Sequence, residues 1–275
     1  MAPSLQMVFQ TRYSFFGASG WRSEASREKE ILFDPARLAK RLDLFEKMNL
    51  ASLRDQTDAD FKLVVLTSID LPEAHSRLME QACSDIVGAE RVHILRRKPA
   101  GAGQWLRKYM RNQLNVTDHA AQIVLDDDDA VSVDFVERCR AEAVHALSQF
   151  REDQDCTYLS FATGFTGLFH ADGGMDLIRR DMPYTNLGLT LVAPTRTRKN
   201  PYMLAHKKVA RRHDVRVFQE QRPFFIRAIH DTNDSRGHHG EVMLDADAVK
   251  AARTWFPLLK DLDLVKLRDE AIAAA

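Results

Sequence analysis

The sequence lacks several features that would assign it to a special class of protein. It carries no net charge, because its 39 lysines and arginines balance 39 aspartates and glutamates. Such a chain has no overall field that draws it to nucleic acid or to an anionic membrane, so any anion site must be local. It also has no basic and apolar leader, and no apolar run near the roughly 18 residues typical of a membrane span. We therefore expect a cytoplasmic protein, at most peripherally bound at the inner face of a membrane.

Cysteine is scarce as well. The three residues Cys83, Cys139 and Cys156 show no CxxC spacing, and an odd number is a poor basis for a disulfide framework. Reduced thiols in a cytosolic compartment are the expected state. There is no internal repeat, low-complexity tract or clear linker in the 275 residues, and 45% of them are hydrophobic. We expect one domain, with a nucleotide-binding half (residues 1–130) and an acceptor half (131–275).

The chain alternates between strand and helix patterns. Short apolar runs at 8–13, 61–67, 92–95 and 122–125 predict strands, and further strands are expected at 157–161, 164–170 and 187–192. Helices are predicted from Asp34-Pro35, from Glu73, over 104–114 and from Ser132 as an N-cap, with a short basic helix at 203–212. Turn-forming residues at 17–20, Gly173-Gly174 and 233–240 indicate loops. The pattern predicts an α/β fold with a mainly parallel sheet flanked by helices, which binds ligands at the carboxyl ends of its strands.

An aspartate run, Asp126 to Asp129, follows the predicted strand Gln122 to Leu125 directly. Adjacent carboxylates in a partly desolvated cleft repel one another unless a cation or ordered donors are present. A divalent cation removes this conflict, and oxygen ligands without nearby cysteine favour Mg²⁺ or Mn²⁺. The alternative is a solvated acidic turn or a helix N-terminus, where aspartate is also favoured. The position at the end of a strand favours the metal site.

The run and several other segments resemble known proteins. Leu125 to Ala130 followed by Val133 to Val136 is similar to the strand, LDxDD and helix segment that carries the DxD motif of GT-A glycosyltransferases. More narrowly, the chain resembles the bacterial family of "putative rhamnosyltransferases". The segments that carry this resemblance are Thr11 to Phe15, Arg41 with Leu44 to Glu46, Ser52-Leu53 with Gln56 to Asp58, Asp60-Phe61, the aspartate run, and His230 to Asn233.

The resemblance implies roles for individual residues. Asp126 and Asp128 match the two motif aspartates, with Asp128 the direct metal ligand, Asp126 also near the ribose, and Asp127 beside the nucleotide. His230 is implied as a third ligand to the metal, although a surface loop histidine is an equal alternative and His238-His239 lies close in sequence. The remaining nucleotide-sugar contacts are implied at the diphosphate for Arg107 and Arg111, and at the base and ribose for Thr11, Arg12, Ser68 and Asp70.

The catalytic base is not identified by the sequence. Related inverting enzymes use an acidic residue in an "ED" pair, and no such pair occurs near residues 202–212. His206 lies in that stretch, while Asp172, Asp176 and Asp181 precede it. We name His206 and Asp181 as candidates.

The expected function is therefore a metal-dependent glycosyltransferase that moves a sugar, such as rhamnose, from a nucleotide-diphosphate sugar to a glycan or lipid-linked glycan. No nucleic-acid partner is expected. Two alternatives remain open. A sugar-phosphate nucleotidyltransferase shares the acidic metal site, but it usually has a glycine-rich basic loop that Ser14-Phe15-Phe16-Gly17 does not match. A non-catalytic metal- or carbohydrate-binding protein would bind the ion without a nucleotide.

Overall fold

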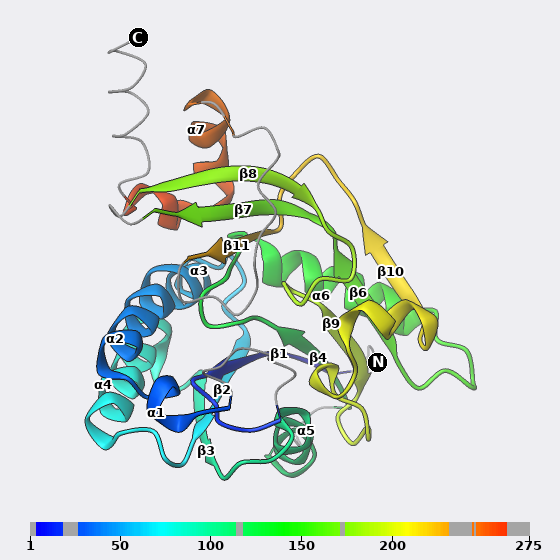
Figure 1. Ribbon diagram of the computed structural model, residues 1–275. Coiled ribbons are helices and arrows are strands. Elements are labelled where there is room, and N and C mark those ends of the chain that lie inside the picture. The colour runs from blue at the N-terminus through cyan, green and yellow to red at the C-terminus, as the bar shows by residue number, and fades with distance from the viewer. Residues whose placement is uncertain are drawn as a thin grey trace.

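A computed structural model describes residues 4–18, 27–113, 118–170, 174–230, 244 and 246–262. Its central element is a seven-stranded sheet with the strand order β10-β6-β9-β4-β1-β2-β3 (Figure 1). The strands are β1 (Leu5–Tyr13), β2 (Phe61–Ser68), β3 (Val92–Arg97), β4 (His119–Val124), β6 (Thr157–Phe161), β9 (Thr190–Pro194) and β10 (Val215–Phe218). Only β9 runs antiparallel to its neighbours in this sheet. The predicted mainly parallel α/β fold is confirmed, and the carboxyl ends of six strands meet at one edge.

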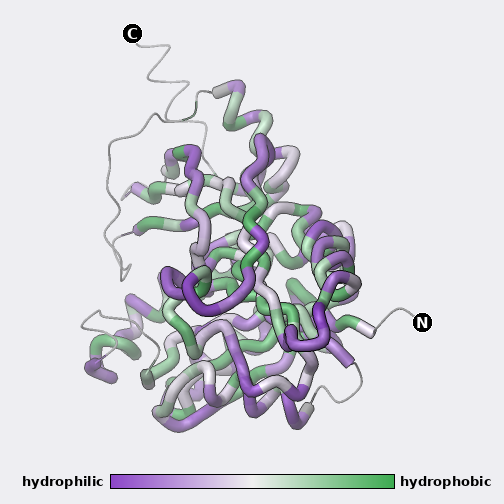
Figure 2. Tube along the Cα trace, turned by 90° about the vertical axis from the view of Figure 1, so that its right-hand side faces the viewer, coloured by the Kyte–Doolittle hydropathy of each residue, from purple (hydrophilic) through white to green (hydrophobic). Residues whose placement is uncertain are grey.

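Helices cover both faces of this sheet. The face that carries Met7, Phe9 and Leu63 packs against α2 (Pro35–Leu44), α4 (Glu73–Cys83) and α6 (Phe135–Ser148). The other face packs against α5 (Ala102–Gln113) and η4 (His206–Arg211). The short helices between these elements are α1 (Lys29–Leu32), η1 (Phe45–Leu50), α3 (Ala51–Arg54), η2 (Ser84–Gly88) and η3 (Pro201–Met203). Hydrophobic residues follow the inner strands, and hydrophilic residues follow the outer helices and loops (Figure 2).

A second, four-stranded sheet lies above the carboxyl edge of the first (Figure 1). Its order is β5-β11-β7-β8, from β5 (Ala130–Val131), β11 (Phe225–Ile229), β7 (Thr163–Phe169) and β8 (Met175–Asp181). Strand β6 continues into β7 through the single residue Ala162, which fixes one sheet relative to the other. Helices α7 (Ala246–Trp255) and η5 (Pro257–Lys260) share a hydrophobic cluster with Phe165 and Ile226 of this sheet. The sheet therefore forms a roof over the edge where ligands are expected.

Local signals explain where several elements begin. Asp34 caps α2 as predicted, because its carboxylate accepts a hydrogen bond from the backbone N–H of Arg37 at 2.9 Å and Pro35 starts the helix. Ser132 is not the N-cap of α6, and that prediction is wrong. The helix begins at Phe135, and the Ser132 hydroxyl donates instead to the Asp134 carboxylate at 3.0 Å, which Arg222 also contacts.

Two other predicted elements are shorter than expected. The strand expected at 187–192 starts only at Thr190, because Gly188 has a positive φ of 73° that turns the chain. The single basic helix expected at 203–212 is replaced by the two short 3₁₀ helices η3 and η4, with extended backbone at Leu204 between them. The loop expected at 233–240, Gly173, and Ser19-Gly20 lie outside the described residues.

Cys83, Cys139 and Cys156 are buried and form no disulfide. Burial raises the pKa of the Cys83 and Cys139 thiols to about 12, which keeps them protonated. Among the described residues, none of the helices has the length and apolar character needed to cross a membrane.

Candidate active site at the carboxyl edge of the sheet

The aspartate run leaves the central sheet and enters the roof. Strand β4 ends at Val124, the run turns tightly with the Asp129 N–H bonded to the Asp126 carbonyl at 3.2 Å, and β5 begins at Ala130. The run therefore lies between the two sheets. Of its four side chains, Asp127 is fully buried, whereas Asp126 keeps 23% of its side-chain surface exposed. Asp126 is the carboxylate most open to a ligand.

Arg41 of α2 is the internal counter-ion of this run. Its guanidinium contacts both carboxylate oxygens of Asp127, with Nε 3.3 Å from Oδ2 and Nη2 on Oδ1, while Nη1 lies 3.0 Å from Asp128 Oδ2. Only 8% of the Arg41 side chain is exposed. The planar fork of arginine is suited to such a bidentate pair, which here ties α2 to the end of β4.

Burial and charge separate the pKa values along the run. Burial raises the pKa of Asp127 to about 7, reinforced by the Asp128 and Asp126 carboxylates and opposed by Arg41. The pKa of Asp129 is also raised, by burial and by the same neighbours. Burial would raise the pKa of Asp128 too, but Arg41 and His230 outweigh it and hold this pKa well below its usual range. Asp128 is thus held as a carboxylate, the form that binds cations.

His230 lies against Asp128. It follows β11 directly, its side chain is 1% exposed, and its Nε2 is 2.9 Å from Asp128 Oδ2. Asp128 precedes β5 and His230 follows β11, and because these strands pair antiparallel, both residues lie at the same end of the pair and present a carboxylate oxygen and an imidazole nitrogen at one point. This donor pair fits Mn²⁺ or Mg²⁺ in its chemistry. Among the described residues no group of three such side chains is placed to hold a metal ion.

Arg12, Asp126 and Tyr202 form the neighbouring part of the site. Arg12 Nη2 donates to Asp126 Oδ1 at 2.8 Å, and its guanidinium lies 4.5 Å from the centroid of the Tyr202 ring. The Tyr202 hydroxyl donates in turn to the Gln10 carbonyl at 2.7 Å. The Arg12 side chain is only 3% exposed, so it contacts Asp126 from the protein interior, while 23% of the Asp126 side chain stays exposed to solvent.

Two further contacts hold the backbone of the run in place. Asn49 of η1 donates through Nδ2 to the Asp126 carbonyl at 2.9 Å and lies 3.4 Å from the hydroxyl of Thr11. The Asp129 carboxylate accepts from the Ala228 N–H of β11 at 2.9 Å. Thr11 and Asp129 are buried, and they support the run from within the protein.

Ser68 and Asp70 lie at the end of β2, one strand along the same edge from β1. The Asp70 N–H is 3.4 Å from the Ser68 hydroxyl, and the Asp70 carboxylate pairs with Lys29 at 2.5 Å. Asp70 is exposed and Ser68 is buried. Both residues lie at the carboxyl edge, and their contact with the base and ribose stays a prediction.

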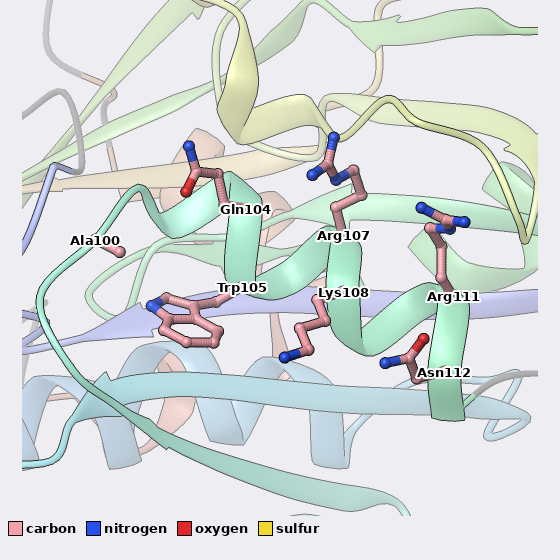
Figure 3. Close-up of a pocket in the computed structure, with 7 residues that line it drawn as sticks. All are labelled: Ala100, Gln104, Trp105, Arg107, Lys108, Arg111 and Asn112. Atoms are coloured by element: carbon pink, nitrogen blue, oxygen red, sulfur yellow. The ribbon is translucent and has the colours of Figure 1, made fainter.

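Arg107 and Arg111 are not brought to the aspartates, and the fold does not support their expected contact with the diphosphate. Helix α5 starts at the carboxyl edge and runs back, so that its last turn lies near the start of β4 at the opposite edge. Both arginines line a separate pocket of about 270 Å³, with Trp105 and Lys108 (Figure 3). Sequence order placed them before the run, but the length of α5 carries them away from it.

This location gives a prediction that separates the two arginines. Arg111→Ala should leave the affinity for a nucleoside diphosphate with Mn²⁺ within about twofold of wild type, as is usual for surface changes. Arg12→Ala, which frees Asp126 from its partner, should weaken it by about 30-fold, since a charged hydrogen bond contributes on the order of 2 kcal/mol. Isothermal titration of both variants tests this. A tenfold loss in Arg111→Ala would return that residue to the donor site.

The two candidate bases, His206 and Asp181, have other hydrogen-bond partners than the aspartate run. The Nδ1 of His206 is 2.5 Å from the Tyr184 carbonyl, at the start of η4. Asp181 ends β8 and accepts from the Thr163 hydroxyl at 2.7 Å, at the opposite edge of the roof from β5. Asp176 pairs with His170, and Asp172 lies outside the described residues. The catalytic base thus remains a proposal for His206 or Asp181.

Three residues of the site carried no assigned role in the sequence. Asn49 and Tyr202 sit in short helical segments without a motif, and nothing local marks them. Arg41 belonged to the segments that carry the family resemblance, but a single arginine in an amphipathic helix gives no sign that it pairs with a carboxylate 86 positions later.

Comparison with known proteins places the chain in a family. Residues 6–242 match the profile of the family described as "Putative rhamnosyl transferase". No curated protein matches the chain significantly. Among solved structures, S. aureus TarS is 11% identical to this chain, with a TM-score of 0.41. The match covers 82% of this chain and 37% of the TarS chain. A "putative nucleotide-diphospho-sugar transferase" from Desulfovibrio desulfuricans G20 is 12% identical with a TM-score of 0.34, over 83% of this chain and 82% of that one.

The family match covers most of the chain, including β1, α2 with Arg41, the aspartate run and His230. The chain belongs to the family described as "Putative rhamnosyl transferase".

Proposed function

We propose that the chain transfers a sugar from a nucleotide-diphosphate sugar to a glycan or lipid-linked glycan, with Mn²⁺ or Mg²⁺ at the Asp128–His230 pair. The observation that supports this most is the 2.9 Å contact between these two side chains, beside the exposed Asp126, at the carboxyl edge of the sheet. The family favours rhamnose as the sugar. No residue described here distinguishes thymidine, uridine or guanosine in the donor.

In this proposal each residue of the site has a separate role. A bound divalent ion would neutralise the charge that develops on the leaving diphosphate. Asp128 and His230 would hold that ion, and Arg41 keeps Asp128 ionised and fixed in place. Arg12 orients Asp126 towards the nucleotide, and Ser68 and Asp70 border the base and ribose. His206 or Asp181 would take the proton of the acceptor hydroxyl.

The test is a thermal-shift screen of nucleotide sugars with and without Mn²⁺, followed by an assay of their hydrolysis. A ligand of the native state raises the melting temperature according to its occupancy. We expect one nucleotide sugar to stabilise the protein only with Mn²⁺ and to be hydrolysed slowly without an acceptor. If only a nucleoside triphosphate stabilises it, and pyrophosphate appears on adding a sugar phosphate, the protein is a nucleotidyltransferase. Stabilisation by Mn²⁺ alone, with no effect of any nucleotide, would favour a non-catalytic binding protein.

A further inference from the structure

Two long stretches of the chain contain basic residues and no acidic ones. Residues 91–117 hold seven lysines and arginines without an aspartate or glutamate, and residues 182–213 hold another seven, also without one. The chain as a whole has equal numbers of both signs. Charge is therefore segregated along this sequence, even though its sum is zero.

The fold brings the two stretches together on one face of the central sheet. Val8, Gln122, Leu191 and Tyr158 are register partners on four neighbouring strands, so their side chains point to the same face. Helix α5 from the first stretch packs on this face near Val8, and η4 from the second packs near Leu191 and Tyr158. They lie on one side of the sheet in Figure 1, and Arg107 Nη1 lies 3.5 Å from the Arg198 carbonyl.

The outer surface of these elements carries cations without counter-ions. Lys108, Arg111, Arg196, Arg198, Lys207 and Lys208, which we call the basic face, are all exposed. None of them forms an ion pair with any described residue. On the opposite face, Arg77 pairs with Glu73 and Lys47 pairs with Asp43. Cations gathered without partners repel one another, and an extended anionic partner would relieve that repulsion.

We infer that the basic face binds the surface of an anionic phospholipid membrane. The same elements carry apolar side chains, because Met203 of η3 is 46% exposed and the Trp105 ring of α5 lies 5.7 Å from the Lys108 ammonium. This mixture matches an interface where phosphates meet acyl chains. Single-stranded nucleic acid would call for exposed aromatic rings on which bases stack, and none of the exposed large hydrophobic residues in the described part of the chain is aromatic.

The η3 segment links this side of the molecule to the candidate active site. Met203 is preceded in η3 by Tyr202, whose ring stacks on the guanidinium of Arg12, the partner of Asp126. A membrane that reaches η3 would therefore lie close to the exposed Asp126, where a lipid-linked acceptor would arrive. This last consequence depends on the proposed function, whereas lipid binding itself does not.

Sedimentation of the full chain with phosphatidylcholine vesicles, with and without phosphatidylglycerol, tests the inference. We expect binding to the anionic vesicles only, and weaker binding as salt rises. The double variants Arg196→Glu/Arg198→Glu and Lys207→Glu/Lys208→Glu should each bind at least about 30-fold more weakly, since each cation near such a surface contributes about fivefold. The matched control Lys47→Glu/Arg77→Glu changes the net charge equally on the opposite face and should lose less than about threefold.

Unchanged melting temperatures show that these surface variants still fold. Three results would overturn the inference. The first is equal binding to neutral and anionic vesicles, or binding to neither. The second is an equal loss in the control variant, which would point to net charge alone. The third is displacement from vesicles by inorganic phosphate at constant ionic strength, or binding of a duplex oligonucleotide in preference to vesicles, which would assign these cations to a phosphate or nucleic-acid site.

Discussion

Asp128→Ala should lose the Mn²⁺-dependent part of nucleoside diphosphate affinity and lower sugar transfer by at least about 100-fold, because even changes around metal ligands cost about 10- to 100-fold. Asp128 is the carboxylate that touches His230, and Arg41 keeps it ionised. Without the Asp128 carboxylate, His230 would be the only remaining metal ligand of the pair. Titration of a nucleoside diphosphate with and without Mn²⁺, together with turnover of the donor, measures both effects.

Asp129→Asn is the matched control within the same run. The Asp129 oxygen that accepts from the Ala228 N–H is retained by the amide of asparagine, and the side chain is buried away from the opening. This variant should keep Mn²⁺-dependent affinity close to wild type. If Asp128→Ala binds the nucleotide as tightly as wild type, or if both variants lose it equally, the metal does not depend on Asp128 in particular.

Arg41→Met should lower the free energy of unfolding by about 3–5 kcal/mol, the usual effect of removing one partner of a buried ion pair. The side chains of Arg41 and Asp127 are 8% and 0% exposed. The variant leaves Asp127 buried without its cation. Urea denaturation followed by circular dichroism measures the change, which is a large share of the 5–15 kcal/mol typical of a domain.

A double variant separates lost charge from lost packing. Arg41→Met/Asp127→Asn removes both charges, so it should be more stable than Arg41→Met alone. Together with the single variants Arg41→Met and Asp127→Asn, it completes a cycle that gives the coupling energy of the pair. Lys47→Met removes an exposed partner of Asp43 four residues away and should cost less than about 0.5 kcal/mol. A loss in Arg41→Met as small as that in Lys47→Met would show that water or another residue replaces the guanidinium.

Much of the central sheet could be predicted, because its signals are local. The strand at 61–67 is a short apolar run between polar residues, and the helix after Asp34-Pro35 has a cap and apolar spacing that need no distant partner. The roof was predicted only in part. Strand β8 has the sequence MDLIRRD, whose mixed charges resemble a loop, and β11 is five residues long. Such strands are set by their neighbours in the sheet and less by their own composition.

The site shows the same division between local and distant signals. The aspartates are adjacent in sequence and follow a strand, so their place at the carboxyl edge followed from the fold class. Their partners Arg41, Asn49 and His230 come from three other elements, and pairing with them depends on how those elements pack. The prediction for Arg111 was wrong for the converse reason. Arg111 is close to the run in sequence, but it lies in the last turn of α5, which ends at the opposite edge of the sheet.

The pairing of β5 with β11 sets where two halves of the site meet. Ala130 lies opposite Ile226, and from this point the chain runs back one residue to Asp129 and forward four residues to His230. In a strand the side chains alternate between faces, so a slip of one residue would turn His230 away from Asp128. The four-residue spacing between Ile226 and His230 therefore determines whether the imidazole reaches Asp128. A single inserted residue there would separate the histidine from the carboxylate while leaving every residue of the site in the sequence.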